Sequence, residues 1–389
     1  MRLLCVSGLA LAGLCAPAHA QLVEIGPLDL GGAVRVNVLD KSWETRSNRF
    51  PRADAEFDTA RLDLGLDTGT GLIGSAQWRV YYYDETERFT SFPHHAWLGF
   101  ENERLGTVKA GIQQVPFGLT PYAANSYFFS IAYYVGLEDD YDLGLSWSQR
   151  QGDWTLDLAY FLADEGDWAG ESQDSARYSY DLVAELGRTD SETGQLNLRT
   201  TWSSIGEDSN GLELGASLQA GLIANEVTDD DGHHLAGAVH ARWRHDRFEA
   251  KLQATAYDYA LESPPGARDD VVVMGAYDFP YEVAADGRIW SAALSYDVPL
   301  TRNWMTRWLD SLTVYEDFSV LTKSSGDFDA SYHNVLGAAF DVKGPFFIYA
   351  DFAAGKNNAW IGPNFSDALA GGGAGEWERR LNINIGAYF

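Results

Sequence analysis

The sequence of 389 residues contains 28 basic and 56 acidic side chains, which gives a formal net charge of −28 at pH 7. This excess of negative charge repels phosphates and argues against a nucleic acid as partner. Aromatic residues make up 13% of the chain, too many for a disordered protein. No stretch after residue 20 contains the roughly eighteen consecutive apolar residues of a transmembrane helix, so none is expected.

Residues 1–20 have the composition of a secretory signal peptide. Arg2 supplies the positive charge, residues 3–14 form an apolar core too short to span a bilayer, and residues 18–20, Ala-His-Ala, provide a cleavage site. The mature chain is expected to begin near Gln21, and both cysteines lie before that point. An exported chain without cysteine fits a bacterial envelope protein that is not stabilised by disulfides.

The rest of the chain alternates apolar and polar residues with a period of two, which predicts strands. In residues 33–40, for example, Val34 and Val36 share one parity and Arg35 and Asn37 the other. The strands expected are residues 33–40, 59–66, 74–82, 95–101, 107–115, 143–149, 154–162, 178–186, 196–203, 212–222, 234–244, 248–257, 289–298, 312–320, 332–342, 346–352 and 379–389.

The last of these strands has the most regular alternation. Its odd-numbered residues from Leu381 to Phe389 are apolar, whereas Asn382 and Asn384 lie on the other parity. Repeated along the chain, this pattern predicts an all-β fold, a transmembrane antiparallel β-barrel over residues 21–389, with lipid on one side of each strand and water on the other. Because a barrel in hydrocarbon has no free edge, the first strand should pair with the last, and Phe389 should take part in closure.

The connections between the strands alternate in length. Short ones at residues 67–71, 102–106, 150–153 and 343–345 alternate with long ones at residues 41–56, 84–94, 116–142, 163–177, 260–287 and 353–378. Short periplasmic turns and long external loops are typical of an outer-membrane barrel. Since both chain ends of such a barrel are periplasmic, seventeen candidate strands are one too many. We expect sixteen strands and a wrong assignment near residues 188–233, where two connections of similar length follow each other.

A barrel of sixteen strands is too wide for its wall side chains to fill, so selectivity requires a segment folded inward. The connection at residues 116–142 is the candidate, because its many aromatic residues need burial and it ends in an acidic run. Alternatively, these aromatics cover the barrel mouth or contact a neighbouring subunit. The residues expected in this constriction loop are Tyr122, Tyr127, Tyr133, Tyr134, Glu138, Asp139 and Asp140.

Charged residues on the polar parity are expected on the channel wall. Cations there, opposite an acidic loop, would create a transverse field that orients dipolar solutes and excludes apolar ones. Alternatively, they pair with acids across strands and brace the wall, and the two interpretations are compatible. The residues expected to line the pore are Arg35, Arg61, Asp63, Arg79, Lys109 and Arg380. A second inward set beside the turn at Asp246 is expected at the periplasmic rim: His240, Arg242, Arg244 and Lys251.

Catalysis and metal binding find little support in the sequence. His94-His95 and His233-His234 lie beside loops, but no cysteine or spaced carboxylate accompanies them to complete a metal site. The serines near histidines show no nucleophile elbow, and residues 371–373, Gly-Gly-Gly, are not followed by the lysine of a phosphate-binding loop. We therefore predict no enzyme, no cofactor and no metal site.

Residues 111–147, GIQQVPFGLTPYAANSYFFSIAYYVGLEDDYDLGLSW, resemble the corresponding region of Gram-negative porins of the phosphate-selective porin O and P family. The terminal aromatic strand is also similar to theirs. The resemblance implies a sixteen-stranded barrel, a homotrimer and a constriction loop that begins after residues 115–118, with Arg35, Arg61, Arg79 and Lys109 on the pore wall. Phosphate specificity is not carried over, because 56 acids outnumber 28 bases, whereas anions need cationic donors along their path.

The function expected is passive diffusion of small hydrophilic solutes and ions through a channel in the bacterial outer membrane. Three alternatives stay open: a cation-preferring pore, an anion- or phosphate-selective pore, and a sugar-preferring channel in which the aromatics of residues 122–134 stack on sugar rings. A structural or adhesive barrel would instead have a plugged lumen. The partners expected are outer-membrane lipids and lipopolysaccharide, the solutes and further copies of the chain.

Overall fold

The computed structural model describes residues 23–44, 54–83, 87–206, 209–264, 266–324 and 326–389. The signal peptide expected at residues 1–20 lies outside the described residues. No helix of the described part is both long enough and apolar enough to cross a membrane.

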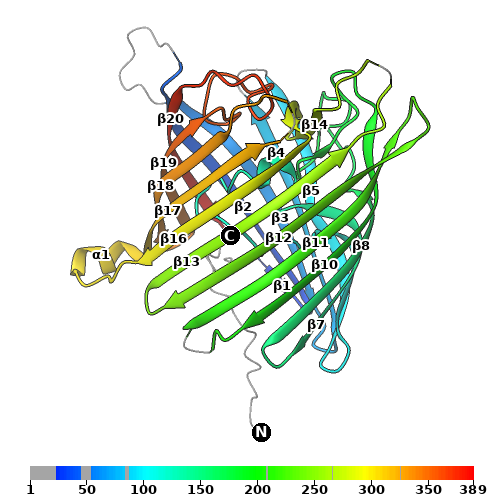
Figure 1. Ribbon diagram of the computed structural model, residues 1–389. Helices are drawn as coiled ribbons and strands as arrows, with labels where there is room; N and C mark the ends of the chain where they lie inside the picture. Colours follow the sequence, from blue (N-terminus) through cyan, green and yellow to red (C-terminus); the bar gives the residue numbers. More distant parts are fainter. Residues whose placement is uncertain (1–22, 45–53, 84–86, 207–208, 265, 325) are drawn as a thin grey trace.

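The chain forms a closed barrel of sixteen antiparallel strands, as the sequence predicts (Figure 1). Consecutive barrel strands are neighbours in space, and each pairs with the next. The barrel strands are β2 (Leu28–Lys41), β3 (Asp54–Asp67), β4 (Leu72–Tyr83), β5 (Arg88–Asn102), β6 (Gly106–Gln114), β7 (Tyr141–Gln151), β8 (Trp154–Asp164), β10 (Asp190–Ser203), β11 (Gly211–Asn225), β12 (Asp231–His245), β13 (Phe248–Ala260), β16 (Asp286–Asp297), β17 (Leu309–Lys323), β18 (Ser331–Val342), β19 (Phe346–Lys356) and β20 (Trp377–Tyr388).

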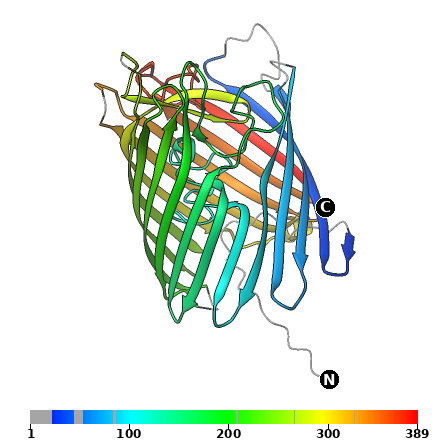
Figure 2. The ribbon, with the colours of Figure 1, turned by 90° about the vertical axis from the view of Figure 1, so that its right-hand side faces the viewer.

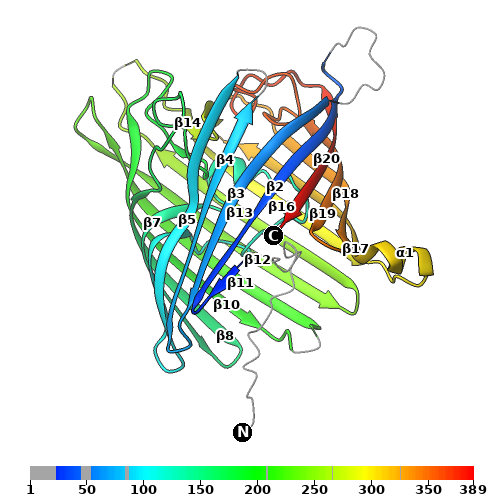
Figure 3. The ribbon, with the colours of Figure 1, turned by 180° about the vertical axis from the view of Figure 1, so that it is seen from behind.

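The first and last barrel strands close the cylinder, as predicted (Figure 3). Strand β2 pairs with β20 from Ala33 opposite Tyr388 to Lys41 opposite Arg380. Beyond the end of β20, the Gly32 N–H donates to the Phe389 carbonyl at 2.7 Å, and the Phe389 N–H donates to the Gly32 carbonyl at 2.9 Å. Closure leaves no unpaired strand edge for lipid to cover.

The barrel is apolar outside and polar inside, the reverse of a soluble protein. In β20, Leu381 is 41% exposed, whereas Asn382 and Asn384 are 0% and 1% exposed. Large apolar side chains such as Leu62, Leu218 and many others are exposed around the wall, and asparagine, glutamine and charged residues are buried within it. This arrangement fits a wall that contacts hydrocarbon on its outer face.

The strand predicted at residues 178–186 is wrong, and it is the extra one. Only β9 (Asp181–Leu182) is extended there, and it joins β14 (Val271–Ala276) and β15 (Phe279–Ala284) in a separate three-stranded sheet. Residues of both parities are buried there, among them Ser179 and Tyr180, so the segment lacks the exposed face of a wall strand. The error expected near residues 188–233 was misplaced, since β10, β11 and β12 are all barrel strands.

The connection predicted at residues 84–94 is shorter than expected, because β5 begins at Arg88. The β4–β5 pairing shifts register so that Gln77 faces His95 and Trp78 faces Pro93, which leaves His94 as the extra residue. Such a bulge accommodates a proline, which cannot donate to the ladder.

Long connections gather at one end of the barrel and short ones at the other (Figure 2). Three short strands, β9 and the β14–β15 hairpin, lie outside the barrel sheet, whereas β1 (Val23–Ile25) pairs with the start of β2. Two short helices, η1 (Tyr133–Val135) and α1 (Asn303–Trp308), lie in connections. Helix α1 projects from the barrel in the connection between β16 and β17 (Figure 1).

Candidate functional site

The connection between β6 and β7 folds into the barrel, and we call residues 115–140 the inward loop. It contacts wall strands that are far from it in the sequence, from β10 to β19 and on to β3. Aromatic residues and tight turns allow this path, since a loop that crosses a barrel must bury both its side chains and its backbone polar groups.

Cations of the wall bind the backbone carbonyls of the first part of the inward loop. Arg199 Nε donates to the Gly118 carbonyl at 2.8 Å, and Arg242 Nη2 donates to the Thr120 carbonyl at 2.9 Å. Lys251 Nζ donates to the Ala124 carbonyl at 3.1 Å and to Asn125 Oδ1 at 2.9 Å. The expectation that Arg242 and Lys251 mark the periplasmic rim is therefore corrected, because both side chains reach the inward loop.

Carboxylates on the next part of the wall bind backbone N–H groups of the same loop. Asp317 Oδ2 accepts from the N–H groups of Asn125 at 2.8 Å and Ser126 at 2.6 Å. Asp351 Oδ2 accepts from the Tyr127 N–H at 3.1 Å, and the Tyr127 hydroxyl donates to Asp58 Oδ1 at 3.1 Å. The loop backbone is thus fixed by side chains from both halves of the barrel, and charge-assisted hydrogen bonds of this kind are the strong ones.

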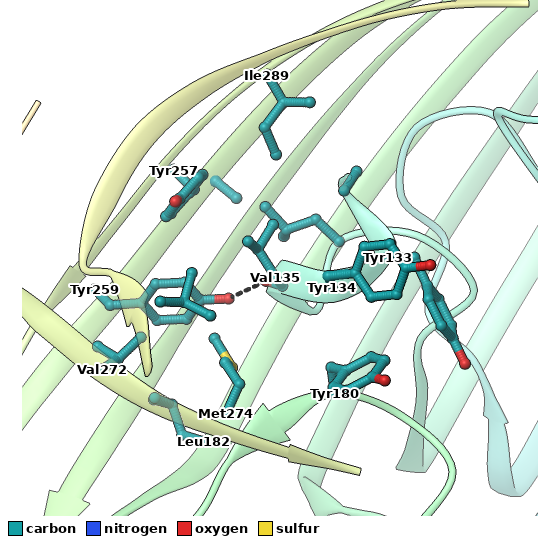
Figure 4. Packing of buried hydrophobic residues seen from close by; sticks show 14 of the residues in the cluster. Tyr133, Tyr134, Val135, Tyr180, Leu182, Tyr257, Tyr259, Val272, Met274 and Ile289 are labelled. Carbon is teal, nitrogen blue, oxygen red and sulfur yellow. Dashed lines mark hydrogen bonds between the residues drawn. The ribbon is translucent and has the colours of Figure 1, made fainter. Parts of the chain in front are cut away.

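The second half of the inward loop packs in an apolar cluster inside the barrel (Figure 4). Tyr134 and Val135 of η1 lie against Tyr180 and the β14–β15 hairpin, and the Tyr259 hydroxyl donates to the Val135 carbonyl at 3.0 Å. The Tyr133 hydroxyl lies 2.5 Å from that of Tyr277. Three loops and the wall therefore share one buried core.

The predicted aromatic residues of the loop differ in exposure. Tyr133 and Tyr134 are buried, and the Tyr134 hydroxyl donates to the Phe128 carbonyl at 2.7 Å. Tyr122 and Tyr127 are half-buried, and the Tyr122 ring centre lies 5.3 Å from that of Phe129. Only the half-buried rings offer a face to a solute.

The three acids at the end of the loop are all buried and have separate surroundings. Glu138 accepts hydrogen bonds from the N–H groups of Ala123 and Ser130 and so braces the loop itself. Asp139 accepts from the Tyr178 hydroxyl at 2.6 Å, and burial raises the pKa of Asp139 to about 7. Asp140 faces Asp142 and Asp181 instead. The acidic run thus does not form one open acidic surface.

Two of the predicted wall arginines form ion pairs with neighbouring acids. Arg35 Nε lies 2.9 Å from Asp58 Oδ2, and Arg61 Nε lies 3.1 Å from Asp63 Oδ2. The Arg61 guanidinium also lies 5.1 Å from the ring centre of Tyr388. These ion pairs correspond to the alternative that the cations pair with acids and brace the wall. The same arginines also lie on the inner side of the wall.

The other three wall cations form no ion pair among the described residues. Arg79 lies 4.6 Å from the ring centre of Tyr178, and its Nε donates to Gln77 Oε1 at 2.5 Å. The Lys109 ammonium lies 4.2 Å from the ring centre of Trp97, and the Arg380 guanidinium lies 5.2 Å from that of Phe128. Arg35, Arg61 and Arg79 stand on the adjacent strands β2, β3 and β4, whereas Lys109 is on β6.

The residues that fix the inward loop were not among those predicted from the sequence. Arg199, Asp317, Asp351 and Asp58 are charged residues on the inward parity of predicted or observed strands, and that parity was the available signal. The parity does not show that all four bind the inward loop, because each lies more than fifty residues from the loop segment that it binds. Arg199 and Gly118, for example, are 81 residues apart.

No family model matches the chain, and no curated protein matches it in sequence. Solved structures do. The anion-selective porin from Comamonas acidovorans has 14% identity and a TM-score of 0.56, over 93% of this chain and 99% of that chain. The fold is that of the outer-membrane porins.

Two further porin-fold structures are similar over nearly the whole chain. The outer membrane channel DcaP of Acinetobacter baumannii has 13% identity and a TM-score of 0.57, over 93% of this chain and 97% of that chain. OmpF of Salmonella typhi has 12% identity and a TM-score of 0.58, over the same shares. At this identity the likeness establishes the architecture alone.

Proposed function

We propose that this protein is an outer-membrane channel for the passive diffusion of small hydrophilic solutes and ions. The observation that carries the proposal is the inward loop, held across the barrel by Arg199, Lys251, Asp317 and Asp351. Such a loop narrows a polar-walled cylinder to a defined passage, which is the arrangement a selective channel requires. The solved structures of similar fold include proteins described as a porin and as a channel.

Planar bilayer recording of the refolded barrel tests this function. We expect stepwise conductance increments from single insertions, and larger increments when Asp317→Ala releases the loop. A folded barrel that inserts without conductance steps would favour a structural or adhesive role with a plugged lumen.

A preference for anions is the second candidate, and the cluster of Arg35, Arg61 and Arg79 on neighbouring strands favours it. Two of these cations are balanced by Asp58 and Asp63, and Arg79 has an aromatic partner instead of a carboxylate among the described residues. Phosphate selectivity is the narrower form of this candidate. Reversal potential in a salt gradient distinguishes anion from cation preference by its sign.

A preference for sugars depends on half-buried aromatic faces. Tyr122, Tyr127 and Phe129 would supply them, since Tyr133 and Tyr134 lie in the buried cluster. Maltodextrins of increasing length should then block the ion current in a concentration-dependent way. If no maltodextrin of any length blocks the current, the preference for sugars is excluded.

We further propose an outer-membrane location with lipid and lipopolysaccharide around the wall and a homotrimeric assembly. The continuous apolar outer surface supports the location, and an OmpT structure of Vibrio cholerae with the same fold is described as a trimer. Cross-linking in native outer membranes, followed by gel electrophoresis without heating, tests the assembly.

A further inference from the structure

Asp140, Asp142 and Asp181 lie together inside the barrel although they come from different segments. Asp140 ends the inward loop, Asp142 is the second residue of β7, and Asp181 belongs to β9 in the next long connection. One carboxylate oxygen from each lies within 4.8 Å of the others, and all three residues are buried. Like charges at this distance repel each other strongly when water is excluded.

Several carboxylate oxygens at this place have no hydrogen-bond donor among the described residues. They are Asp140 Oδ1, Asp142 Oδ1 and Glu165 Oε2. Glu165 is not one of the three clustered acids, but its carboxyl group lies within hydrogen-bonding range of Asp181 and is itself buried. Buried polar atoms without partners are rare in proteins, and here they all belong to carboxyl groups.

The local cations do not balance these acids. Arg177 is the one guanidinium that pairs with this group in the part of the chain that the structure describes, and its Nη1 atom lies 2.6 Å from Asp164 and 3.3 Å from Asp181. Asp164 also faces Asp142 directly in the β7–β8 pairing. Glu192 adds another acid, with Oε2 3.9 Å from His234 Nδ1. Among the described residues, one arginine therefore lies among six carboxyl groups, those of Asp140, Asp142, Asp164, Glu165, Asp181 and Glu192.

We propose that Asp140, Asp142 and Asp181 bind a calcium ion, with Glu165 as a further ligand. The site offers only oxygen ligands, which suits a hard divalent cation. One oxygen from each of the three residues lies close enough to the others to share a single ion. Calcium accepts several protein carboxylates at once, whereas magnesium keeps several of its waters and is usually held by one or two carboxylates.

The ion would fasten the end of the inward loop to the next long connection. Asp142 is already held by β10, since Gln195 Nε2 donates to its Oδ2 at 3.1 Å. Asp181 lies between Tyr180 and Leu182, whose side chains join the aromatic cluster with η1 (Figure 4). Calcium would thus stabilise the packing of two loops inside the barrel, whether or not the barrel conducts.

The test uses the full-length refolded barrel in detergent after removal of metals with EDTA. We expect one saturable calcium ion per chain at concentrations up to about 1 mM by isothermal titration calorimetry, and a higher unfolding temperature in calcium than in EDTA. Magnesium should bind more weakly. No saturable calcium binding by the folded wild-type barrel would overturn the proposal, and this result does not depend on any variant.

Asp181→Asn and Asp140→Asn test the ligands. Each should weaken calcium binding at least tenfold and remove the rise in unfolding temperature, while stability in EDTA stays equal or increases because repulsion is relieved. Asp230→Asn is the matched control, since Asp230 is an exposed acid of another connection at the same end of the barrel. If Asp230→Asn weakened calcium binding equally, calcium would bind only to the acidic surface of the protein. That result would overturn the proposed site.

Discussion

Arg61 and Arg79 lie directly opposite each other in the β3–β4 pairing. Their strand neighbours Leu62 and Trp78 are exposed on the outer surface, so both arginines face the inside. Like charges in directly opposed positions destabilise a sheet. Asp63 pairs with Arg61, whereas Arg79 rests on the Tyr178 ring, so positive charge remains at this point of the wall.

The charge on this wall should affect ion preference. We expect Arg79→Gln to shift the reversal potential in a salt gradient toward cations, because it removes a fixed positive charge from the passage. Arg61→Gln should act in the same direction, since it leaves the negative charge of Asp63 without its ion-pair partner. Arg104→Gln, in the exposed turn between β5 and β6, is the control. If Arg104→Gln shifted the reversal potential by the same amount, the effect would come from the net charge of the protein and not from the charge on this wall.

The attachment of the inward loop to Asp317 should set the width of the passage. Asp317→Ala removes the acceptor of two backbone N–H groups, which leaves them unpaired inside the protein and costs roughly 2 to 4 kcal/mol of stability. We expect a larger and noisier single-channel conductance. Asp310→Ala, at an exposed position of the same strand, should change neither property. Unchanged conductance in a folded Asp317→Ala barrel would argue that the loop is held by its apolar cluster alone.

The closure seam depends on the close approach of Gly32 and Phe389. A Cβ atom at Gly32 would lie 2.6 Å from the Arg61 carbonyl and 3.1 Å from the Phe389 ring. Gly32→Ala should therefore slow or reduce assembly, measured as the fraction of heat-modifiable folded protein on a gel. Gly237→Ala, where the nearest atom is at 3.6 Å, should assemble normally. Deletion of Phe389 should produce the same defect, because it removes both hydrogen bonds to Gly32.

A charged residue on the outer surface at mid-height of the wall should destabilise the barrel. Leu218 of β11 is 63% exposed, and Leu218→Arg should cost about 2 to 4 kcal/mol in unfolding from lipid vesicles. Leu105 in a short turn is 67% exposed, but Leu105→Arg should cost about 0 to 1 kcal/mol, because a charge near the interface remains hydrated. Equal costs would mean that the wall around Leu218 is not in contact with hydrocarbon.

The barrel could be predicted from the sequence because the alternation that indicates it involves neighbouring residues. Residues such as Leu381 and Asn382 must face opposite sides of a strand, and this alternation recurs along the barrel wall. It failed at residues 178–186, where residues of both parities are buried among other loops, such as Ser179 and Tyr180. Period two identifies which residues share a face, but not whether that face meets lipid or other loops.

The inner wall could be predicted in part. Arg35, Arg61 and Arg79 were placed on the inward parity, and the structure adds their partners Asp58, Asp63 and Tyr178. The role of Lys251 was misjudged, since its sequence position beside a short turn suggested the rim. Its ammonium reaches Ala124, 127 residues away, because the loop crosses the barrel.

The sequence by itself determined the strand class, the face of each strand that is apolar and the segment rich enough in aromatics to fold inward, since each follows from neighbouring residues. Only the tertiary structure decided which charges bind that segment and that Asp140, Asp142 and Asp181 meet. The physical reason is closure of the cylinder. It brings side chains from opposite walls and from separate loops within a few ångströms of each other. These residues are so far apart in the sequence that no short motif predicts their contact.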